Sequence, residues 1–438
     1  MSQISIKHKN PLRGELTPPP DKSISHRAVI LASLAEGRSV IRNFLYAEDP
    51  LSTVGAFRQM GVEIEVRRQN SEHKEEMSPT EILINGNGLS GLKNPEGPID
   101  CGNSGTTMRL LCGVLAGQPF SATLKGDASL SRRPMKRVIG PLAQMGAVFK
   151  SDNGNPPLTV TGGQLKPISY KSPVASAQVK SAILLAGLYC DGITSVLEPE
   201  KSRDHSERML RASGADIKID GLSVSIKGRA VLRPFDLTVP ADFSSAAFFI
   251  VAGLIVPGSE ILLKNVGINP TRTGLLEVLQ SMGADIRLEN TREVSGEPVA
   301  DIFVRHSSLT GIEIGGDMVP KSIDEFPILC VASAVAEGKT KITGAKELRV
   351  KESDRIAAMA AELSKMGVRT EELEDGLIIG GKEKLGPAAI KSYGDHRIAM
   401  SMAIAGLMTD GETIISDTDC INTSFPGFIE ILDRLQKS

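Results

Sequence analysis

One pattern of polar and apolar positions occurs six times along the chain. Each copy begins with a short polar cluster, continues as an apolar, Ala- and Leu-rich segment, and passes through a glycine into a β-branched run. A capping residue before an apolar segment predicts a helix start, and a β-branched run predicts a strand. The copies span residues 21–44, 103–124, 176–199, 242–266, 324–344 and 395–417.

A second helical segment follows each copy and ends in Met-Gly or Ser-Gly before another strand-like run. The glycines are Gly61, Gly146, Gly214, Gly283 and Gly367, and the sixth segment is FIEILDRLQKS at 428–438. A glycine in this place predicts a left-handed residue that ends the helix. We therefore interpret the chain as six α/β units of roughly 65 to 85 residues each.

The units divide equally about Pro240, with three before it and three after it. A chain of 438 residues is too long for one core, so we expect two similar domains, 21–239 and 1–20 joined with 240–438. The prolines at 18–20 and the segment 239–245 would be two chain crossings. Adjacent crossings form a hinge, and the cleft between the domains is the expected ligand site.

Composition narrows the class of protein. A net charge of −2, no long basic run and no tryptophan argue against a nucleic-acid surface. No uninterrupted apolar run reaches membrane length, and the first ten residues lack a signal-peptide core. Five cysteines without CxxC spacing indicate a reducing compartment and no metal site. We expect a cytoplasmic monomer without nucleic-acid or membrane partners.

Charged residues gather at the predicted helix starts. Lys22, Ser23 and Arg27 lie at the first, where free backbone N–H groups and the helix dipole favour an anion. Similar clusters are CGNSGTTMR (101–109), SLSRRPMKR (129–137), ASAQVK (175–180), SIDEF (322–326), RVKESDR (349–355) and GDHR (394–397). If the units are related by pseudo-symmetry, these ends face one cleft, which would suit polyanions.

Each cluster alone also has an ordinary structural interpretation. NSGTT could be only a tight turn, and RRP and VKESDR could be solvated charge clusters. The histidine of DHR could be structural, and Cys101 and Cys112 fit small buried fillers better than nucleophiles. The repetition of such clusters at matching helix starts favours the joint, functional interpretation.

Seven of these motifs, in order, resemble the motif series of the 5-enolpyruvylshikimate-3-phosphate synthase family: DKSISHR, GNSGTTMR, GDASLSRRPM, ASAQVKSA, DEFP, RVKESDR and DHRIAM. The resemblance spans nearly the whole chain. It implies an α/β fold of two domains, each with three βαβαββ units in an inside-out barrel, and an active site in the cleft between them. It also implies transfer of the enolpyruvyl group of phosphoenolpyruvate to the 5-hydroxyl of shikimate 3-phosphate, with phosphate released and no metal or organic cofactor. This is a step of aromatic amino-acid biosynthesis.

The resemblance also implies which residues bind the substrates. Shikimate 3-phosphate would contact Lys22, Ser23, Arg27, Ser176, Ala177, Gln178, Asp324 and Lys351. Phosphoenolpyruvate would contact Lys22, Gly105, Arg133, Gln178, Arg355 and Arg397. Two phosphates and two carboxylates carry roughly five to six negative charges, which the six cations in these sets would offset.

The reaction needs two opposite proton transfers. We assign Asp324 to take the proton of the attacking 5-hydroxyl and Glu352 to protonate the methylene of phosphoenolpyruvate. Lys22 would stabilise the departing phosphate.

The chain departs from the commonest family pattern at several positions. Ala177 stands in place of a second serine, Thr423 replaces a lysine, and Leu110 replaces a proline. These differences indicate a more divergent branch. Two alternatives remain: a UDP-amino-sugar enolpyruvyltransferase, which uses a reactive loop cysteine, and a non-catalytic anion-binding relative. No cysteine here lies in a basic, glycine-rich loop, and Asp324, Glu352 and Lys22 are all present.

Overall fold

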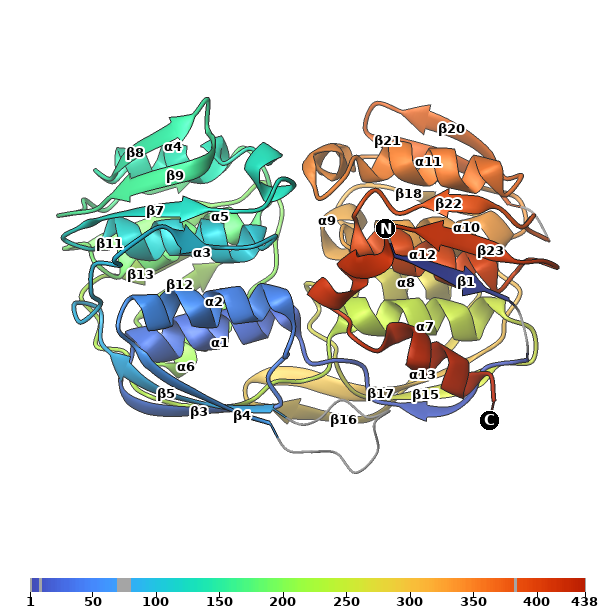
Figure 1. Ribbon diagram of the computed structural model, residues 1–438, viewed down its shortest axis with the longest axis horizontal. Helices are drawn as coiled ribbons and strands as arrows, with labels where there is room; N and C mark the ends of the chain where they lie inside the picture. Colours follow the sequence, from blue (N-terminus) through green and yellow to red (C-terminus); the bar gives the residue numbers. More distant parts are fainter. Residues whose placement is uncertain (1, 8–9, 69–79, 382–383, 438) are drawn as a thin grey trace.

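The structure is a computed structural model that describes residues 2–7, 10–68, 80–381 and 384–437. Two halves of similar architecture stand side by side (Figure 1), and each has its own buried core. One core is built from residues 24–239. The other is built from residues 6–16 together with residues 243–435. The predicted two-domain α/β fold is thereby confirmed.

The first helix of each unit starts at the predicted polar cluster. These helices are α1 (Lys22–Leu34), α3 (Gly105–Ala116), α5 (Ala177–Gly187), α7 (Phe243–Ile255), α10 (Phe326–Val335) and α12 (His396–Gly406). Every residue of α7 and α12 is buried. A helix that is apolar on all sides is surrounded by protein, and here α7 and α12 both pack against α10. The first helices therefore form the centre of each half.

The second helices are α2 (Glu48–Gln59), α4 (Lys136–Gln144), α6 (His205–Ala212), α8 (Gly274–Ser281), α11 (Arg355–Lys365) and α13 (Phe428–Leu435). The five predicted glycines that follow them all have positive φ, from 82° at Gly61 to 111° at Gly146. This confirms the left-handed helix ends. One further short helix, α9 (Met318–Ser322), was not predicted from the pattern.

Six small sheets cover the helices among the described residues. The strands of the first half are β3 (Glu36–Arg42), β4 (Glu63–Arg68), β5 (Thr80–Asn87), β6 (Ile99–Asp100), β7 (Ser121–Lys125), β8 (Val148–Asp152), β9 (Asn155–Thr161), β10 (Ser169–Lys171), β11 (Ile193–Leu197), β12 (Ile217–Asp220), β13 (Ser223–Lys227) and β14 (Asp236–Thr238). Their sheet orders are β14-β3-β5-β4, β6-β7-β9-β8 and β10-β11-β13-β12. Each has one parallel edge strand and an antiparallel hairpin.

The strands of the second half are β1 (Gln3–Ile6), β2 (Arg13–Leu16), β15 (Glu260–Gly267), β16 (Asp285–Val294), β17 (Glu297–Arg305), β18 (Glu313–Ile314), β19 (Lys339–Ile342), β20 (Arg369–Leu373), β21 (Gly376–Gly380), β22 (Ala389–Lys391) and β23 (Thr413–Ser416). Their sheet orders are β16-β17-β15-β2, β18-β19-β21-β20 and β1-β23-β22. Two of these sheets are completed by the N-terminal segment. Strand β1 pairs antiparallel with β23, with Gln3 opposite Ser416, and β2 pairs parallel with β15.

The two chain crossings pair with each other. Pro20 and Ala241 form an antiparallel bridge. The N–H of Asp21 donates to the Pro240 carbonyl (2.8 Å), and the N–H of Asp242 donates to the Pro19 carbonyl (2.7 Å). The buried Arg272 forms ion pairs with both aspartates. The crossings, the start of α1 and the start of α7 are therefore joined at one point.

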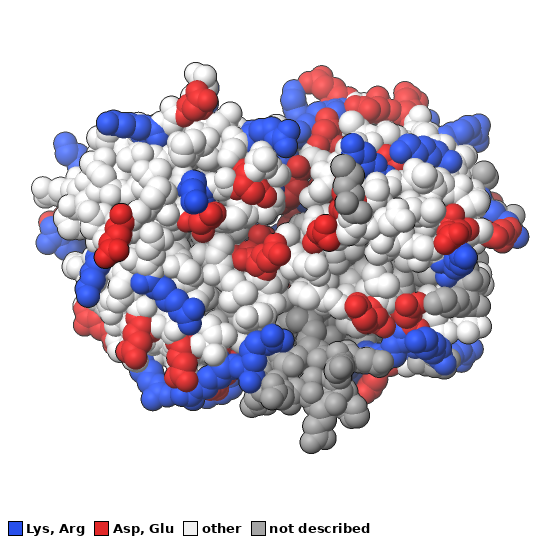
Figure 2. Space-filling view, viewed as in Figure 1, with Lys and Arg blue, Asp and Glu red and all other residues white. Residues whose placement is uncertain are grey.

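The surface carries charges of both signs. On the face shown in Figure 2, Lys and Arg side chains are interspersed with Asp and Glu. Within the described ranges, no helix is both long enough and apolar enough to span a bilayer.

Candidate functional site

The start of α1 is fixed from both halves. Asp21 caps the helix by accepting the Ile24 N–H (2.8 Å), and the Lys22 N–H donates across the halves to Asp242 Oδ2 (3.0 Å). The Lys22 ammonium forms an ion pair with Asp49 Oδ2 (2.9 Å), at the start of α2. Sequence reasoning did not identify Asp49, because its contact with Lys22 depends on how α1 and α2 pack.

Arg27 is buried inside the first half. Its guanidinium donates to the hydroxyls of Ser206 (2.7 Å) and Ser181 (3.0 Å) and to the carbonyl of Ser23 (3.0 Å). Burial lowers the pKa of Arg27 to about 10, and Glu207 opposes that change. The positive charge of Arg27 is thus held mainly by neutral groups.

Arg133 lies against the turn that begins α3. It donates to the Asn103 carbonyl (3.1 Å) and side chain (2.6 Å). Ser104 caps the helix, so Gly105 is its first residue. A Cβ on Gly105 would lie 2.9 Å from Arg109 Nη1 and 3.4 Å from Arg133 Nη1. The absence of a side chain at Gly105 therefore leaves room for two guanidinium groups.

The start of α5 is joined to the start of α3. Ser176 precedes the helix without making a side-chain capping bond, and Ala177 is its first residue. Gln178 accepts from Arg109 Nη1 through Oε1 (2.6 Å) and donates from Nε2 to Thr106 Oγ1 (2.9 Å). Arg109 belongs to the GNSGTTMR motif but was not predicted to be a site residue.

Arg355 connects three carboxylates in the second half. This buried residue starts α11 and donates from Nε to Asp395 (2.9 Å) and from Nη2 to Glu352 (2.6 Å). Its Nη1 lies 3.6 Å from Asp324 Oδ1. Asp324 and Glu352, the two predicted proton carriers, therefore border the same guanidinium.

Two other predicted cations lie near Asp324. Arg397 donates to the Asp324 carbonyl (2.8 Å) and lies 3.5 Å from its carboxylate. Lys351 is half-buried between the 3₁₀ turn Lys346–Val350 and α11. Burial lowers the pKa of Lys351, and Asp324 opposes that change.

Neighbouring arginines keep both predicted proton carriers ionised at neutral pH. Burial acts to raise the pKa of Asp324, but Arg203 and Arg397 hold it well below its usual range. Burial likewise acts to raise the pKa of Glu352, and Arg355 and Arg133 outweigh it.

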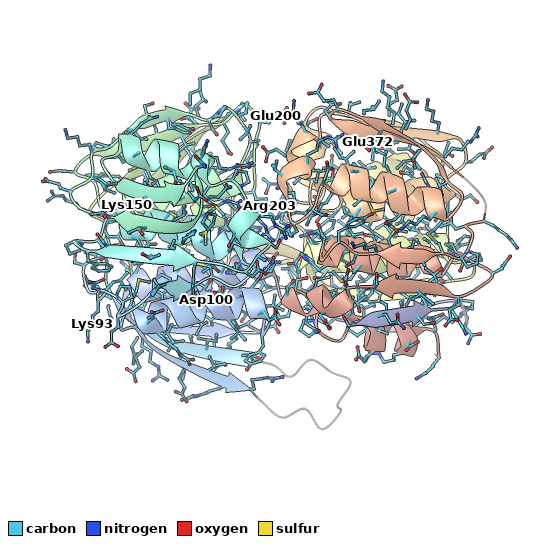
Figure 3. All side chains as sticks on the ribbon, turned by 45° about the horizontal axis from the view of Figure 1, so that its top comes forward. Lys93, Asp100, Lys150, Glu200, Arg203 and Glu372 are labelled. Atoms are coloured by element: carbon cyan, nitrogen blue, oxygen red, sulfur yellow. The ribbon has the colours of Figure 1, made fainter. Side chains whose placement is uncertain are left out.

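Ion pairs bridge the two halves at these residues. Arg203 Nη2 lies 2.5 Å from Asp324 Oδ2, and Arg133 Nη1 lies 3.7 Å from Glu352 Oε1. Arg203 lies where the halves meet (Figure 3). Its segment, SRDHSE, is not among the charged clusters at the predicted helix starts, so sequence reasoning missed it. Predicted residues from both halves are thus brought together.

The five cysteines are held as thiols. Burial raises the pKa of Cys112 and of Cys420 to about 12, and it raises the pKa values of Cys101, Cys190 and Cys330 as well. In the part of the chain that the structure describes, no three His, Cys, Asp or Glu side chains are placed to hold a metal ion.

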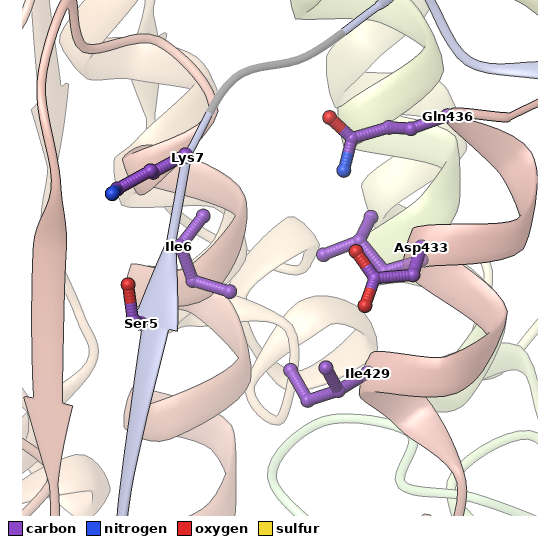
Figure 4. Close-up of a pocket in the computed structure, with 7 residues that line it drawn as sticks. Ser5, Ile6, Lys7, Ile429, Asp433 and Gln436 are labelled. Atoms are coloured by element: carbon purple, nitrogen blue, oxygen red, sulfur yellow. The ribbon is translucent and has the colours of Figure 1, made fainter.

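A cavity of about 240 Å³ lies elsewhere, between β1 and α13 (Figure 4). It is lined by Ser5, Ile6, Lys7, Ile429, Leu432, Asp433 and Gln436. None of the predicted site residues lines it.

Comparison with known proteins gives a consistent result. The sequence profile of the family described as EPSP synthase (3-phosphoshikimate 1-carboxyvinyltransferase) matches residues 6–432. Proteins named 3-phosphoshikimate 1-carboxyvinyltransferase from Geotalea uraniireducens and Thermodesulfovibrio yellowstonii are each 55% identical, with 99% of both chains covered. A solved EPSP synthase structure from Acinetobacter baumannii is 49% identical, with a TM-score of 0.86, and covers 100% of this chain and 98% of that one.

Proposed function

The chain belongs to the EPSP synthase family, and we propose that the residues described above carry out the reaction of that family at the junction of the two halves. The protein transfers the enolpyruvyl group of phosphoenolpyruvate to the 5-hydroxyl of shikimate 3-phosphate and releases phosphate. This transferase reaction belongs to the shikimate pathway of aromatic amino-acid biosynthesis.

One observation carries the assignment of the site. Cations and carboxylates from opposite halves meet directly, through Arg203 with Asp324 and Arg133 with Glu352. Substrates that carry phosphates and carboxylates are bound by the same cations, because a guanidinium pairs with either group in two-point contact. Bound substrates would therefore take the place of ion pairs that join the two halves.

We assign the two substrates to overlapping sets of residues. Shikimate 3-phosphate is bound by Lys22, Ser23, Arg27, Ser176, Ala177, Gln178, Asp324 and Lys351. Phosphoenolpyruvate is bound by Lys22, Gly105, Arg133, Gln178, Arg355 and Arg397. The cap positions of α1, α3 and α5 support this assignment, since free N–H groups at helix starts bind anions.

Asp324 acts as the base. The 5-hydroxyl oxygen bonds to C2 of phosphoenolpyruvate while its proton passes to the Asp324 carboxylate, which its lowered pKa keeps ionised at neutral pH. Glu352 gives a proton to the C3 methylene. Loss of a C3 proton back to Glu352 and departure of phosphate towards Lys22 then restore the double bond.

Glu352 must hold a proton to act as the acid. Its pKa is low because of Arg355 and Arg133, and both arginines belong to the set that binds phosphoenolpyruvate. The negative groups of that substrate offset the two positive charges and add a like charge beside the carboxylate. Its pKa therefore rises when the substrate binds.

The two alternatives receive no support from the structure. A UDP-amino-sugar enolpyruvyltransferase needs a reactive thiolate, whereas burial raises the pKa of every cysteine here. A non-catalytic relative has no use for Asp324 and Glu352 held around one buried arginine, which is costly to maintain.

The remaining assignments concern the protein as a whole. We propose domains of residues 21–239 and of residues 1–20 with 240–438, in line with the two separate cores. We also propose a cytoplasmic monomer that binds small molecules and not nucleic acid, in line with its net charge of −2.

A phosphate-release assay tests the function. We expect phosphate to appear only when shikimate 3-phosphate and phosphoenolpyruvate are both present, and not with either alone. Release with a UDP-amino-sugar in place of shikimate 3-phosphate would favour the first alternative. Binding of both substrates without release would favour the second.

A further inference from the structure

The side-chain amide of Gln178 is held at both ends by α3. Its Oε1 accepts from Arg109 Nη1 at 2.6 Å, and its Nε2 donates to Thr106 Oγ1 at 2.9 Å. Thr106 and Arg109 lie on the first turns of α3, while Gln178 is the second residue of α5. The contact therefore joins two helix starts through one amide.

The chemistry of the partners fixes which way the amide faces. A guanidinium has only N–H donors, so the amide end beside Arg109 must be the oxygen. The nitrogen then faces Thr106, whose hydroxyl accepts one of its two N–H bonds. One N–H donor remains on Gln178, and a donor is what an anionic substrate oxygen requires.

The buried charge of Arg109 is stabilised by few other partners. The structure gives it no ion pair with a carboxylate within the described ranges, and its enclosed Nε has no hydrogen-bond partner. Burial, with Arg137 and Arg133 nearby, lowers the pKa of Arg109 to about 10. A buried cation retained only for stability would normally be paired with a carboxylate, as Arg272 is with Asp21 and Asp242.

We propose that Arg109 and Thr106 are positioning residues that fix which end of the Gln178 amide faces the substrates. The inference rests on the proposed function, in which Gln178 contacts both substrates. Without the two partners the amide can rotate by 180°, because its oxygen and nitrogen ends are nearly equal in size. The rotated amide presents a carbonyl oxygen to anionic groups and weakens their binding.

A double-mutant cycle on the full-length protein tests this role. The variants are Arg109→Met, Thr106→Val, Thr106→Ser and Gln178→Ala, together with Arg109→Met and Thr106→Val made in the Gln178→Ala background. We expect kcat/KM for phosphoenolpyruvate to fall about 10- to 100-fold in Arg109→Met, which loses a charged hydrogen bond, and about 2- to 10-fold in Thr106→Val. Thr106→Ser keeps the hydroxyl and should retain near-normal kcat/KM.

The decisive result is the effect in the Gln178→Ala background. If Arg109 and Thr106 act through Gln178, neither substitution changes kcat/KM further there, within about twofold. Equal losses with and without Gln178 would overturn the proposal, since a purely structural role is independent of the amide. If Arg109→Met does not fold, the Thr106 variants decide the question by themselves.

Two controls separate the possible failures. Thr123→Val removes a comparable hydroxyl contact, to Thr159 Oγ1 (2.9 Å), on β7 away from these helix starts, and it should leave kcat/KM unchanged. The unmodified protein must release phosphate from the two substrates. If it does not, the proposed function fails. If it does and the cycle is additive, only the positioning role fails.

Discussion

Two buried arginines of the first half are held in a different way from a buried arginine of the second. In the first half, Arg27 and Arg109 are held by hydroxyls, a carbonyl and an amide, and burial lowers the pKa of each to about 10. In the second half, Arg355 is held by Asp395, Glu352 and Asp324, which together raise its pKa against the effect of burial. Among the described residues, Arg27 and Arg109 thus have no carboxylate partner, whereas Arg355 is already paired with the two proposed proton carriers.

This difference suggests a division of labour. In the proposed function, Arg27 contributes to substrate binding, and the carboxylates around Arg355 include the two proposed proton carriers. The following experiments test that division, beginning with the largest expected effect.

Turnover should depend most on the carboxylates of the second half. Asp324→Asn and Glu352→Gln keep the side-chain shape but cannot carry a proton, so we expect kcat to fall about 10²- to 10⁴-fold. Asp49→Asn is the comparison from the first half and should lower kcat much less. Steady-state kinetics with both substrates saturating measures this. Near-normal turnover in either second-half variant would remove that residue from the mechanism.

Stability should respond more strongly to the loss of a paired arginine. Arg355→Met removes the arginine paired with the buried Asp395 and one of the cations beside Glu352 and Asp324, and we expect a loss of about 3–5 kcal/mol. Arg27→Met leaves only hydroxyls and a carbonyl unsatisfied, with an expected loss of about 1–3 kcal/mol. Urea unfolding of both variants measures the difference. Equal losses would show that leaving the neutral partners of Arg27 without their arginine costs as much stability as leaving the carboxylates around Arg355 without theirs.

Arg133 is one of the first-half cations that reach the second half, where it lies beside Glu352. Arg133→Ala should weaken phosphoenolpyruvate by about 1.5–3 kcal/mol, the value of a charged hydrogen bond, and leave shikimate 3-phosphate binding nearly unchanged. Arg132→Ala is the matched control, because Arg132 is exposed and, within the described residues, its side chain donates to the Ala128 carbonyl alone. Titration with each substrate measures both affinities. If Arg133→Ala weakened shikimate 3-phosphate more than phosphoenolpyruvate, the assignment of Arg133 to phosphoenolpyruvate would be wrong.

Mild acid should affect the two halves alike. Burial lowers the pKa of His26 in the first half and of His396 in the second, with Lys22 adding to both shifts. Below pH 6.5 the unfolded chain takes up protons that the native state cannot, so stability falls as pH falls. The expected loss is up to about 1.4 kcal/mol per pH unit for each histidine.

Unfolding free energies at pH 7, 6 and 5 measure that slope. His26→Gln and His396→Gln should each reduce it by a similar amount. If only one of the two variants reduced the dependence of unfolding free energy on pH, the two histidines would not contribute equally, and the halves would differ in this property too.

Sequence reasoning predicted most of the fold because the signals are local. Asp21 caps α1 as its position implies, and Gly146 ends α4 with the positive φ that its place predicts. The pairing of β1 with β23 could not be assigned, because Gln3 and Ser416 are so far apart in the sequence. The short helix α9 lacked a repeated signal altogether.

The site was predictable only in part, for the same reason. Lys22, Arg133 and Asp324 were identified at their helix starts, but their partners depend on how distant elements pack. Asp49 and Arg203 are examples: each lies in an ordinary polar stretch and becomes significant only beside Lys22 or Asp324. A local sequence pattern does not indicate which distant residues come into contact.

The double crossing of the chain sets an order for biosynthesis. Residues 24–239 contribute the entire core of the first half. The first half can therefore fold during translation, before the second half has been synthesised. The second half must wait, because β1 pairs with β23 near the other end of the chain. At about 5–20 residues per second, β1 waits roughly 20–80 s for its partner. Throughout that time β1 is an unpaired strand that can pair with wrong partners, and its sheet in the second half is completed only after β23 has been translated.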